Sequence, residues 1–212
     1  MMETTYKEKF KSMSPKDKID YIWEYYKFHI LAGLVVIFII GSIIHSFVTR
    51  VDTYCSLTYY NAYTDEDSFY ALQDKLNEII FPDKNNIAVK FDDILTDSAL
   101  ALSPNQQFSA KIAAKEVDLA IVSEQVFKQQ CSDDMFLNLS ELKEFNDLNL
   151  PESVLVKGTS FNGEEGVFGL YVSQIPMFKE ANFSTNDNIL VIIVNSERVE
   201  ESINTINYLM EN

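Results

Sequence analysis

The sequence predicts an N-terminal transmembrane helix followed by one mixed-sheet α/β domain. A run of 22 residues without Asp, Glu, Lys or Arg lies between Lys27 and Arg50. After this run, short apolar and β-branched segments alternate with segments whose apolar residues recur at helical spacing, which is typical of α/β domains. A hairpin pattern then precedes the last strand and helix, and this order favours a sheet with mixed strand directions.

The uncharged run, residues 28–49, is long enough to cross a membrane as one helix. Its 22 residues would extend about 33 Å, and the hydrocarbon core of a bilayer is ~30 Å thick. Trp23, Tyr25 and Tyr26 precede the run, where an interfacial aromatic belt is expected. A cleaved signal peptide is disfavoured because its apolar region is usually about 7–15 residues long, and a buried core helix because the run has no polar stripe.

The distribution of basic residues predicts the orientation of this helix in the cell membrane. Arg50 is the only basic residue between the run and Lys75, whereas six lysines precede the run: Lys7, Lys9, Lys11, Lys16, Lys18 and Lys27. By the positive-inside rule, residues 1–27 are cytoplasmic and residues 53–212 form a domain outside the membrane. The lipid bilayer is therefore an expected partner of the chain.

The cytoplasmic segment is expected to hold a juxtamembrane helix that continues into the membrane. Ser14 suits the N-cap position, and Pro15 suits the first helical position. Ile19, Ile22 and Trp23 then follow at three- and four-residue spacing and form an apolar stripe. This stripe either lies at the membrane interface or docks a partner helix.

The strands of the outer domain follow from local patterns. Residues 54–62 are rich in aromatic and β-branched side chains, and residues 87–91 alternate between apolar and polar. Residues 117–122 and 189–194 are mostly apolar, as in strands that are buried on both faces of a sheet. Two further strands, 154–161 and 167–173, flank Asn162-Gly163 and form a predicted hairpin with a loop of up to five residues.

Helices are expected between these strands. Thr64 caps the first of them, with Asp67 at the third helical position. Pro104 begins a helix of about ten residues, and Ser123 caps a helix that ends near residue 130. Shorter helices are predicted at 141–145 and 175–180, and a last helix is predicted to start at Asn195 and Ser196.

Charge and composition exclude several classes of function for the outer domain. Residues 51–212 hold 10 of the 17 Lys and Arg residues and 27 of the 32 Asp and Glu residues, a formal charge of −17 that opposes binding to nucleic acid. His29 and His45 lie at the two ends of the run, so the domain lacks the base of Ser-His-Asp or Cys-His catalysis. Neither a glycine-rich phosphate loop nor a zinc ligand set is present. We expect no catalytic residue, no cofactor and no metal.

Cys55 and Cys131 face an oxidising exterior in the predicted orientation. Cys55 opens the first strand, and Cys131 follows the helix after the 117–122 strand. Strand starts and helix ends lie at the same edge of a parallel sheet, so a disulfide between the two is geometrically open. Two buried free thiols are the alternative.

Four segments carry a resemblance to a known fold family: AKIAAKEVDLAIVSEQVF, FLNLSELKEF, VFGLYVSQIPMF and ILVIIVNSERVEESINTINYLME. Their order resembles one lobe of the type 2 periplasmic, or extracellular, solute-binding proteins. The whole chain also resembles single-pass membrane-anchored proteins of low-GC Gram-positive bacteria, which begin with a YIWxYYK-type segment like residues 21–27 here. Solute-binding proteins usually close two lobes on a ligand in a much longer chain, so a reduced lobe is implied, and a small-molecule ligand stays open.

Three functions remain as hypotheses. The leading one is a non-enzymatic extracytoplasmic binding or accessory module of an envelope complex, such as a transporter, with another membrane or envelope protein as partner. The second is a sensor or signalling subunit that relays through the juxtamembrane helix. The third is an envelope hydrolase that uses carboxylates alone.

Overall fold

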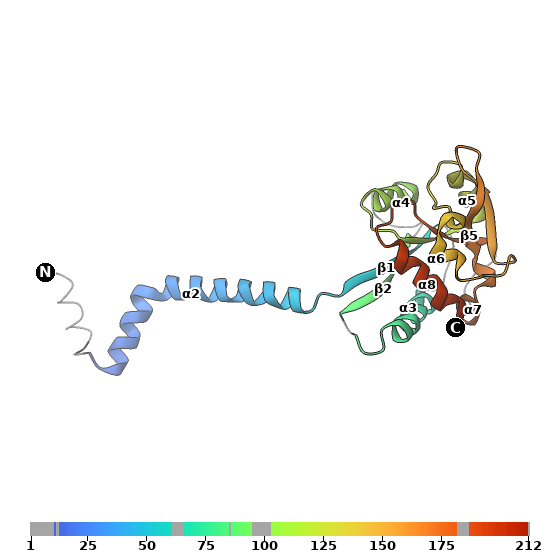
Figure 1. Cartoon of the computed structure of the whole chain (residues 1–212). Helices are drawn as coiled ribbons and strands as arrows, with labels where there is room; N and C mark the ends of the chain where they lie inside the picture. Colours follow the sequence, from blue (N-terminus) through green and yellow to red (C-terminus); the bar gives the residue numbers. More distant parts are fainter. Residues whose placement is uncertain are drawn as a thin grey trace. The chain divides into compact units, whose positions relative to one another are not determined.

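A computed structural model of the chain describes residues 11, 13–60, 66–84, 86–94, 103–181 and 187–211. The chain divides into two compact units, Met1–Arg50 and Val51–Asn212. The first unit contains one long helix, and the second contains a six-stranded sheet with helices packed on both faces (Figure 1).

The long helix is α2, Pro15–Val48. It begins as predicted, because the Ser14 side chain accepts a hydrogen bond from Asp17 N–H and Pro15 takes the first helical position. The helix continues unbroken through the uncharged run, and none of its residues is buried. It is long and apolar enough to cross a membrane. Figure 1 shows that α2 changes direction in its N-terminal half.

The three aromatic residues predicted at the membrane interface lie on this helix before the uncharged run. Trp23 and Tyr25 are each 64% exposed, and Tyr26 is 51% exposed. Tyr25 also packs against Tyr21, with the ring centroids 4.7 Å apart. Exposed aromatic rings of this kind suit the headgroup region of a bilayer, where their amphipathic character is satisfied.

The sheet of the second unit has the strand order β2-β1-β3-β6-β5-β4. Strands β1, β2 and β3 are parallel, and β6, β5 and β4 continue the sheet in antiparallel pairs, so the predicted mixed direction is confirmed. The strand bounds are β1 Asp52–Tyr60, β2 Ile87–Ile94, β3 Leu119–Ser123, β4 Leu155–Thr159, β5 Glu165–Tyr171 and β6 Asn188–Ile192. The central strands β3 and β6 are almost wholly buried, as their apolar sequences predict.

Helices cover both faces of this sheet and enclose two hydrophobic clusters. One cluster packs α3, α7 and α8 against the sheet through residues such as Leu76, Phe178 and Ile206. The other packs α4 and α5 against the opposite face through Phe108 and Phe127. The helix bounds are α3 Glu66–Ile80, α4 Pro104–Ala113, α5 Glu124–Cys131, α6 Lys143–Asn146, α7 Pro176–Glu180 and α8 Val199–Glu211, with 3₁₀ turns η1 Leu139–Glu141 and η2 Val172–Gln174. The predicted Thr64 cap lies outside the described residues.

The β2 edge of the sheet is covered by polar side chains of α3. At the β2 edge, the Asn77 side chain of α3 accepts from Val89 N–H at 2.8 Å and donates to the Val89 carbonyl at 3.0 Å. Gln73 accepts from Phe91 N–H at 2.7 Å. These side chains occupy the groups that another strand would use, so α3 protects the β2 edge.

The hairpin of β4 and β5 has a loop of residues 160–164, the longer of the predicted lengths. Gly163 has a φ of 82°, which a residue without Cβ adopts at little cost. The Ser160 N–H donates to the Glu164 carbonyl at 2.9 Å and closes the loop. Phe161 at the tip is 77% exposed.

The last helix, α8, begins at Val199 and not at Asn195–Ser196 as predicted. The Ser196 hydroxyl donates to the Asp118 carboxyl group at 2.7 Å and accepts from Arg198 N–H at 3.1 Å. The Asn195 side chain donates to the Ile112 carbonyl at 2.8 Å. These tertiary bonds hold both residues outside the helix.

Candidate functional site

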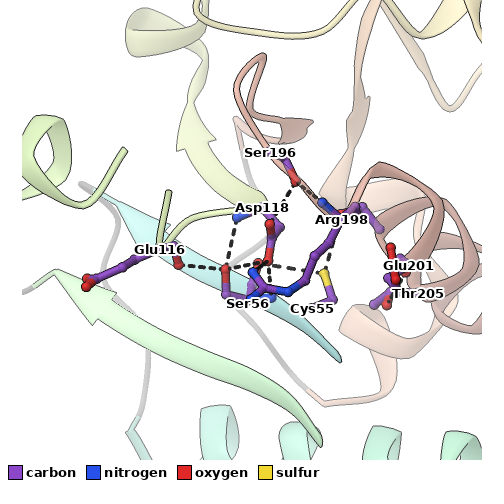
Figure 2. Close-up of polar contacts among 9 residues, drawn as sticks. Cys55, Ser56, Glu116, Asp118, Ser196, Arg198, Glu201 and Thr205 are labelled. Carbon is purple, nitrogen blue, oxygen red and sulfur yellow. Dashed lines mark hydrogen bonds and ion pairs between the residues drawn. The ribbon is translucent and has the colours of Figure 1, made fainter. Parts of the chain in front are cut away.

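A buried polar cluster centres on Asp118, immediately before β3 (Figure 2). Asp118 is the only charged residue that is buried among those the structure describes, with 0% of its surface exposed. Its Oδ2 atom lies 2.9 Å from both the backbone nitrogen and the hydroxyl of Ser56. Arg198 contributes an ion pair to the same oxygen at 3.3 Å. Because Ser196 binds the other carboxyl oxygen, the carboxyl group accepts from three residues in two other segments of the chain.

The cluster extends through Ser56 and the start of α8. The Ser56 hydroxyl lies 2.7 Å from the Glu116 carbonyl and accepts from Asp118 N–H at 2.9 Å. Ser202 donates to the Arg198 carbonyl at 2.7 Å and contacts the Cys55 thiol at 3.5 Å. The cluster therefore ties together β1, the start of β3 and the segment that joins β6 to α8. The Asp118 carboxyl is therefore enclosed, and its bonds hold these three segments of the chain together.

The two cysteines lie on opposite faces of the sheet. Cys55 belongs to the cluster beneath α3 and α8, whereas Cys131 belongs to the cluster beneath α4 and α5. Both are buried free thiols. Strand starts and helix ends at one edge of a parallel sheet leave open which face of the sheet α5 covers. The placement on opposite faces therefore does not support a Cys55–Cys131 disulfide and agrees with the alternative of two free thiols.

The Cys55 thiol predicts a pH dependence of stability. Burial raises the pKa of Cys55 to about 12, against the opposing effect of its hydrogen bond with Ser202. An unfolded cysteine has a pKa of about 8.5, so above this pH the unfolded chain releases a proton that the folded chain retains. The free energy of unfolding should then fall as pH rises, by about 1.4 kcal/mol per pH unit for this group. Urea unfolding followed by circular dichroism at about pH 8 and about pH 10 measures the fall.

The matched variant for this prediction is Cys55→Ala. Between these two pH values it should lose about 2 kcal/mol less stability than the wild-type chain, whatever its stability at the lower pH. Burial raises the pKa of Cys131 in the same direction, so Cys131→Ala is the second comparison. An identical pH dependence of stability in the wild-type chain and in Cys55→Ala would contradict the assignment of the effect to the Cys55 thiol.

Polar side chains also meet at the carboxyl ends of β1 and β3, where open α/β sheets often bind ligands. The buried Tyr59 hydroxyl accepts from Asn188 Nδ2 at 3.0 Å, and Tyr60 hydrogen-bonds Asn105. The Tyr60 ring stacks on Phe108 with the centroids 4.2 Å apart. Burial raises the pKa of Tyr59 to about 12, and the charge of Asp93 adds to this rise. Tyr59, Tyr60 and their partners are thus engaged with one another at this end of the sheet.

Two hollows lie beside β4, the edge strand opposite β2, and share the residues Lys157, Gly158 and Thr159. The first, which we call the α5 hollow, has a volume of about 370 Å³. Its walls include the apolar side chains of Phe127, Cys131, Val156 and Ile189, and its rim carries Glu124 and Lys128. The second, which we call the η1 hollow, has a volume of about 430 Å³ and is lined by Ser140, Glu165, Gly166 and Val167.

Gly158 explains how α5 comes so close to this edge strand. A Cβ atom at residue 158 would lie 2.6 Å from the Cys131 sulfur and 3.1 Å from the Phe168 ring. Only glycine leaves room for the end of α5 at this position, so the depth of the α5 hollow depends on it. Neither hollow was predicted from the sequence, because the packing of a helix end on a strand leaves no local pattern. The nearest signal is the glycine itself within an apolar strand.

Comparisons with known proteins gave little. No protein-family model matches the chain, and no curated protein matches it. Among solved structures, the chain is similar to an extracellular solute-binding protein family 1 from Alicyclobacillus acidocaldarius subsp. acidocaldarius DSM 446, with 17% sequence identity and a TM-score of 0.36. The similarity covers 57% of this chain and 28% of that chain, so this chain spans less than a third of the neighbour's length.

Proposed function

We propose that the chain is a membrane-anchored binding or accessory module of an envelope complex, with its folded domain outside the cell membrane. The observation that carries the proposal is α2. All of its apolar side chains are unburied within the chain, and residues 28–48 contain no charged residue. A bilayer is the environment in which such a surface is stable.

The orientation within this proposal rests on the basic residues that flank α2. Lysines are concentrated before the uncharged run, and Arg50 is the only basic residue between the run and Lys75. Insertion with the lysines in the cytoplasm puts the acidic domain on the outer side. A domain with a formal charge of −17 is also well hydrated there and repels copies of itself.

The binding role is supported by the β4 edge. Two hollows adjoin this strand, one mainly apolar and one with polar and apolar lining in equal measure. Within each hollow, the lining includes one carboxylate residue, Glu124 or Glu165, so neither lining supplies the carboxylate pair of a glycosidase. Hollows of this kind are better suited to holding side chains of a partner protein than to carboxylate-dependent hydrolysis.

The proposal predicts where the chain is found and what it holds. The full chain should remain in membranes washed with alkaline carbonate. Protease added to intact spheroplasts should digest the domain of residues 53–212 and leave an N-terminal tag protected. Cross-linking in the membrane before solubilisation should then recover a discrete membrane or envelope protein together with the chain.

The control is a chimaera that keeps residues 1–52 and carries an unrelated soluble domain after them. It should insert in the same way and recover no such partner, since the proposed binding surface belongs to the outer domain. Protection of the domain from added protease would contradict the orientation. Recovery of the same proteins by both chains would contradict the binding role.

A further inference from the structure

We propose that the outer edge of β4 is a peptide-docking site, at which an extended segment of a partner protein adds as a further strand of the sheet. The inference rests on the proposed function, because it names the surface by which the domain would hold its partner. The segment would alternate apolar and polar side chains and carry a neutral or positive net charge. Three independent features of the described residues lead to this site.

The first feature is the direction of the backbone groups of β4. Lys157 pairs with Val167 of β5, but the Val167 N–H donates to the Ser140 hydroxyl at 2.7 Å and not to Lys157. The pair is therefore of the non-hydrogen-bonded kind, in which both residues turn N–H and C=O away from each other. Lys157 thus presents one donor and one acceptor to the free edge.

The neighbouring residues agree with this direction. Thr159 lies two residues further on, so its backbone also points outward, and it hydrogen-bonds the Cys131 thiol at the end of α5. Leu155, on the other side of Lys157, has the same alternation, but its N–H already donates to the Glu152 carbonyl at 3.2 Å. The β2 edge is closed by Asn77 and Gln73, whereas no described side chain bonds to the outward groups of Lys157. The β2 edge is therefore protected, and the open donor and acceptor of the β4 edge are those of Lys157.

The second feature is the pair of hollows that flank this edge. The α5 hollow is walled by members of the cluster under α4 and α5, and the η1 hollow includes Val167, which packs against the other cluster. They therefore open on opposite faces of the sheet. Successive side chains of a strand point to opposite faces, so an added strand would place alternate side chains in the two hollows. The apolar walls of the α5 hollow favour aliphatic side chains, whereas the η1 hollow, with Ser140 and Glu165 in a lining that is half polar, also accepts polar ones.

The third feature is charge, which selects a different protein over a second copy. Symmetric pairing of two β4 strands would bring Lys157 near its counterpart, and like charges across a strand pair are destabilising. It would also bring together two domains with a formal charge of −17 each. A neutral or basic segment avoids both costs and is attracted by the acidic domain at long range.

The test uses the full chain in lipid nanodiscs and a display library of random peptides of about ten residues, which is longer than an average strand. Peptides that alternate apolar and polar residues should be enriched over empty nanodiscs. The informative variant is Lys157→Pro, because proline lacks the outward N–H and is tolerated at a non-hydrogen-bonded edge position. It should weaken the binding of the enriched peptides by about tenfold or more, whereas Lys157→Ala should change it by less than about threefold.

A second variant keeps the test decisive if the proline variant unfolds. Ser132→Trp would fill the α5 hollow from its exposed rim without changing β4, and Ser109→Trp on the surface of α4 is the matched control. The first should weaken peptide binding and the second should not. Absence of enriched peptides, or equal binding by Lys157→Pro and wild type, would overturn the docking site. The membrane cross-linking experiment would still recover a partner in that case if the proposed function holds.

Discussion

Replacing Asp118 with alanine is expected to lower the free energy of unfolding of the outer domain by about 3–5 kcal/mol. The Asp118 carboxyl is fully buried and accepts hydrogen bonds from Ser56 and Ser196 as well as the ion pair with Arg198. Alanine would leave the Ser56 N–H without its acceptor in a site that water does not reach. It would also remove the carboxyl group that forms an ion pair with the Arg198 guanidinium (Figure 2). Urea unfolding of the full chain in micelles, followed by circular dichroism, measures the loss.

The matched control is Asp92→Ala, which removes the same side chain from a surface ion pair. Asp92 binds Lys111 at 2.5 Å, but both side chains are about a third exposed or more, at 42% and 32%. Exposed pairs of this kind contribute about 0–1 kcal/mol, so Asp92→Ala should change stability little. Arg198→Ala should lower the free energy of unfolding by an amount between those of the two aspartate variants. The Arg198 side chain is 36% exposed, so water can replace part of its interaction with Asp118. Equal losses for Asp118→Ala and Asp92→Ala would contradict the structural role of the cluster.

Much of the fold could be predicted because it depends on short-range patterns. The Ser14–Pro15 start of α2 needs only the chemistry of a helix N-terminus. The apolar residues of β3 and β6 indicate strands with both faces covered, and the structure buries both strands in the middle of the sheet. Asn162-Gly163 marks a turn because glycine adopts the positive φ that the loop needs. Each of these signals lies within a few residues of the feature it specifies.

The remainder could not be predicted because it depends on partners that are distant in the sequence. Asp118 looks like an acid at the start of an apolar strand, and its partner Ser196 lies 78 residues further along the chain. The same bond shifts the start of α8, so one missed contact also explains the misplaced helix boundary. The choice between a Cys55–Cys131 disulfide and two free thiols could not be made from the sequence for the same reason. It depends on which face of the sheet α5 covers, and the path of the chain over the sheet decides that. A pattern in one segment does not carry this information.

The candidate site at the β4 edge could not be predicted from the sequence for the same reason. The sequence indicates a hairpin but not that β4 ends the sheet, because strand order follows from topology. It also does not indicate that α3 would protect the β2 edge while the outward backbone groups of Lys157 on the β4 edge stay open. The two hollows form where α5 packs beside β4 and where η1 packs beside β5, and both are lined by Lys157, Gly158 and Thr159. The candidate site is thus a product of the assembled sheet, and the lysine in its centre is unremarkable in the sequence.

Placing two arginines in the middle of α2 is expected to remove the chain from the membrane. Arginine at the centre of a transmembrane helix costs about 2.5–3.5 kcal/mol in insertion experiments, so Ile37→Arg with Ile40→Arg should cost about 5–7 kcal/mol. Both side chains are exposed on α2, and no protein group in the described part of the chain would compensate for the added charges. The double variant should leave the carbonate-resistant membrane fraction, as judged by immunoblotting of washed membranes.

Two controls separate the loss of insertion from a general effect of mutation on α2. Ile37→Leu with Ile40→Leu conserves the apolar surface and should leave the chain in the membrane fraction. Ile19→Arg with Ile22→Arg adds the same charge to α2 before the uncharged run, where arginine remains at or outside the headgroup region, and should also be retained. Retention of Ile37→Arg with Ile40→Arg in the carbonate-resistant fraction would mean that the exposed apolar surface of α2 is covered by something other than lipid. The helix would then be an interface with another protein, and the anchoring role proposed for it would be wrong.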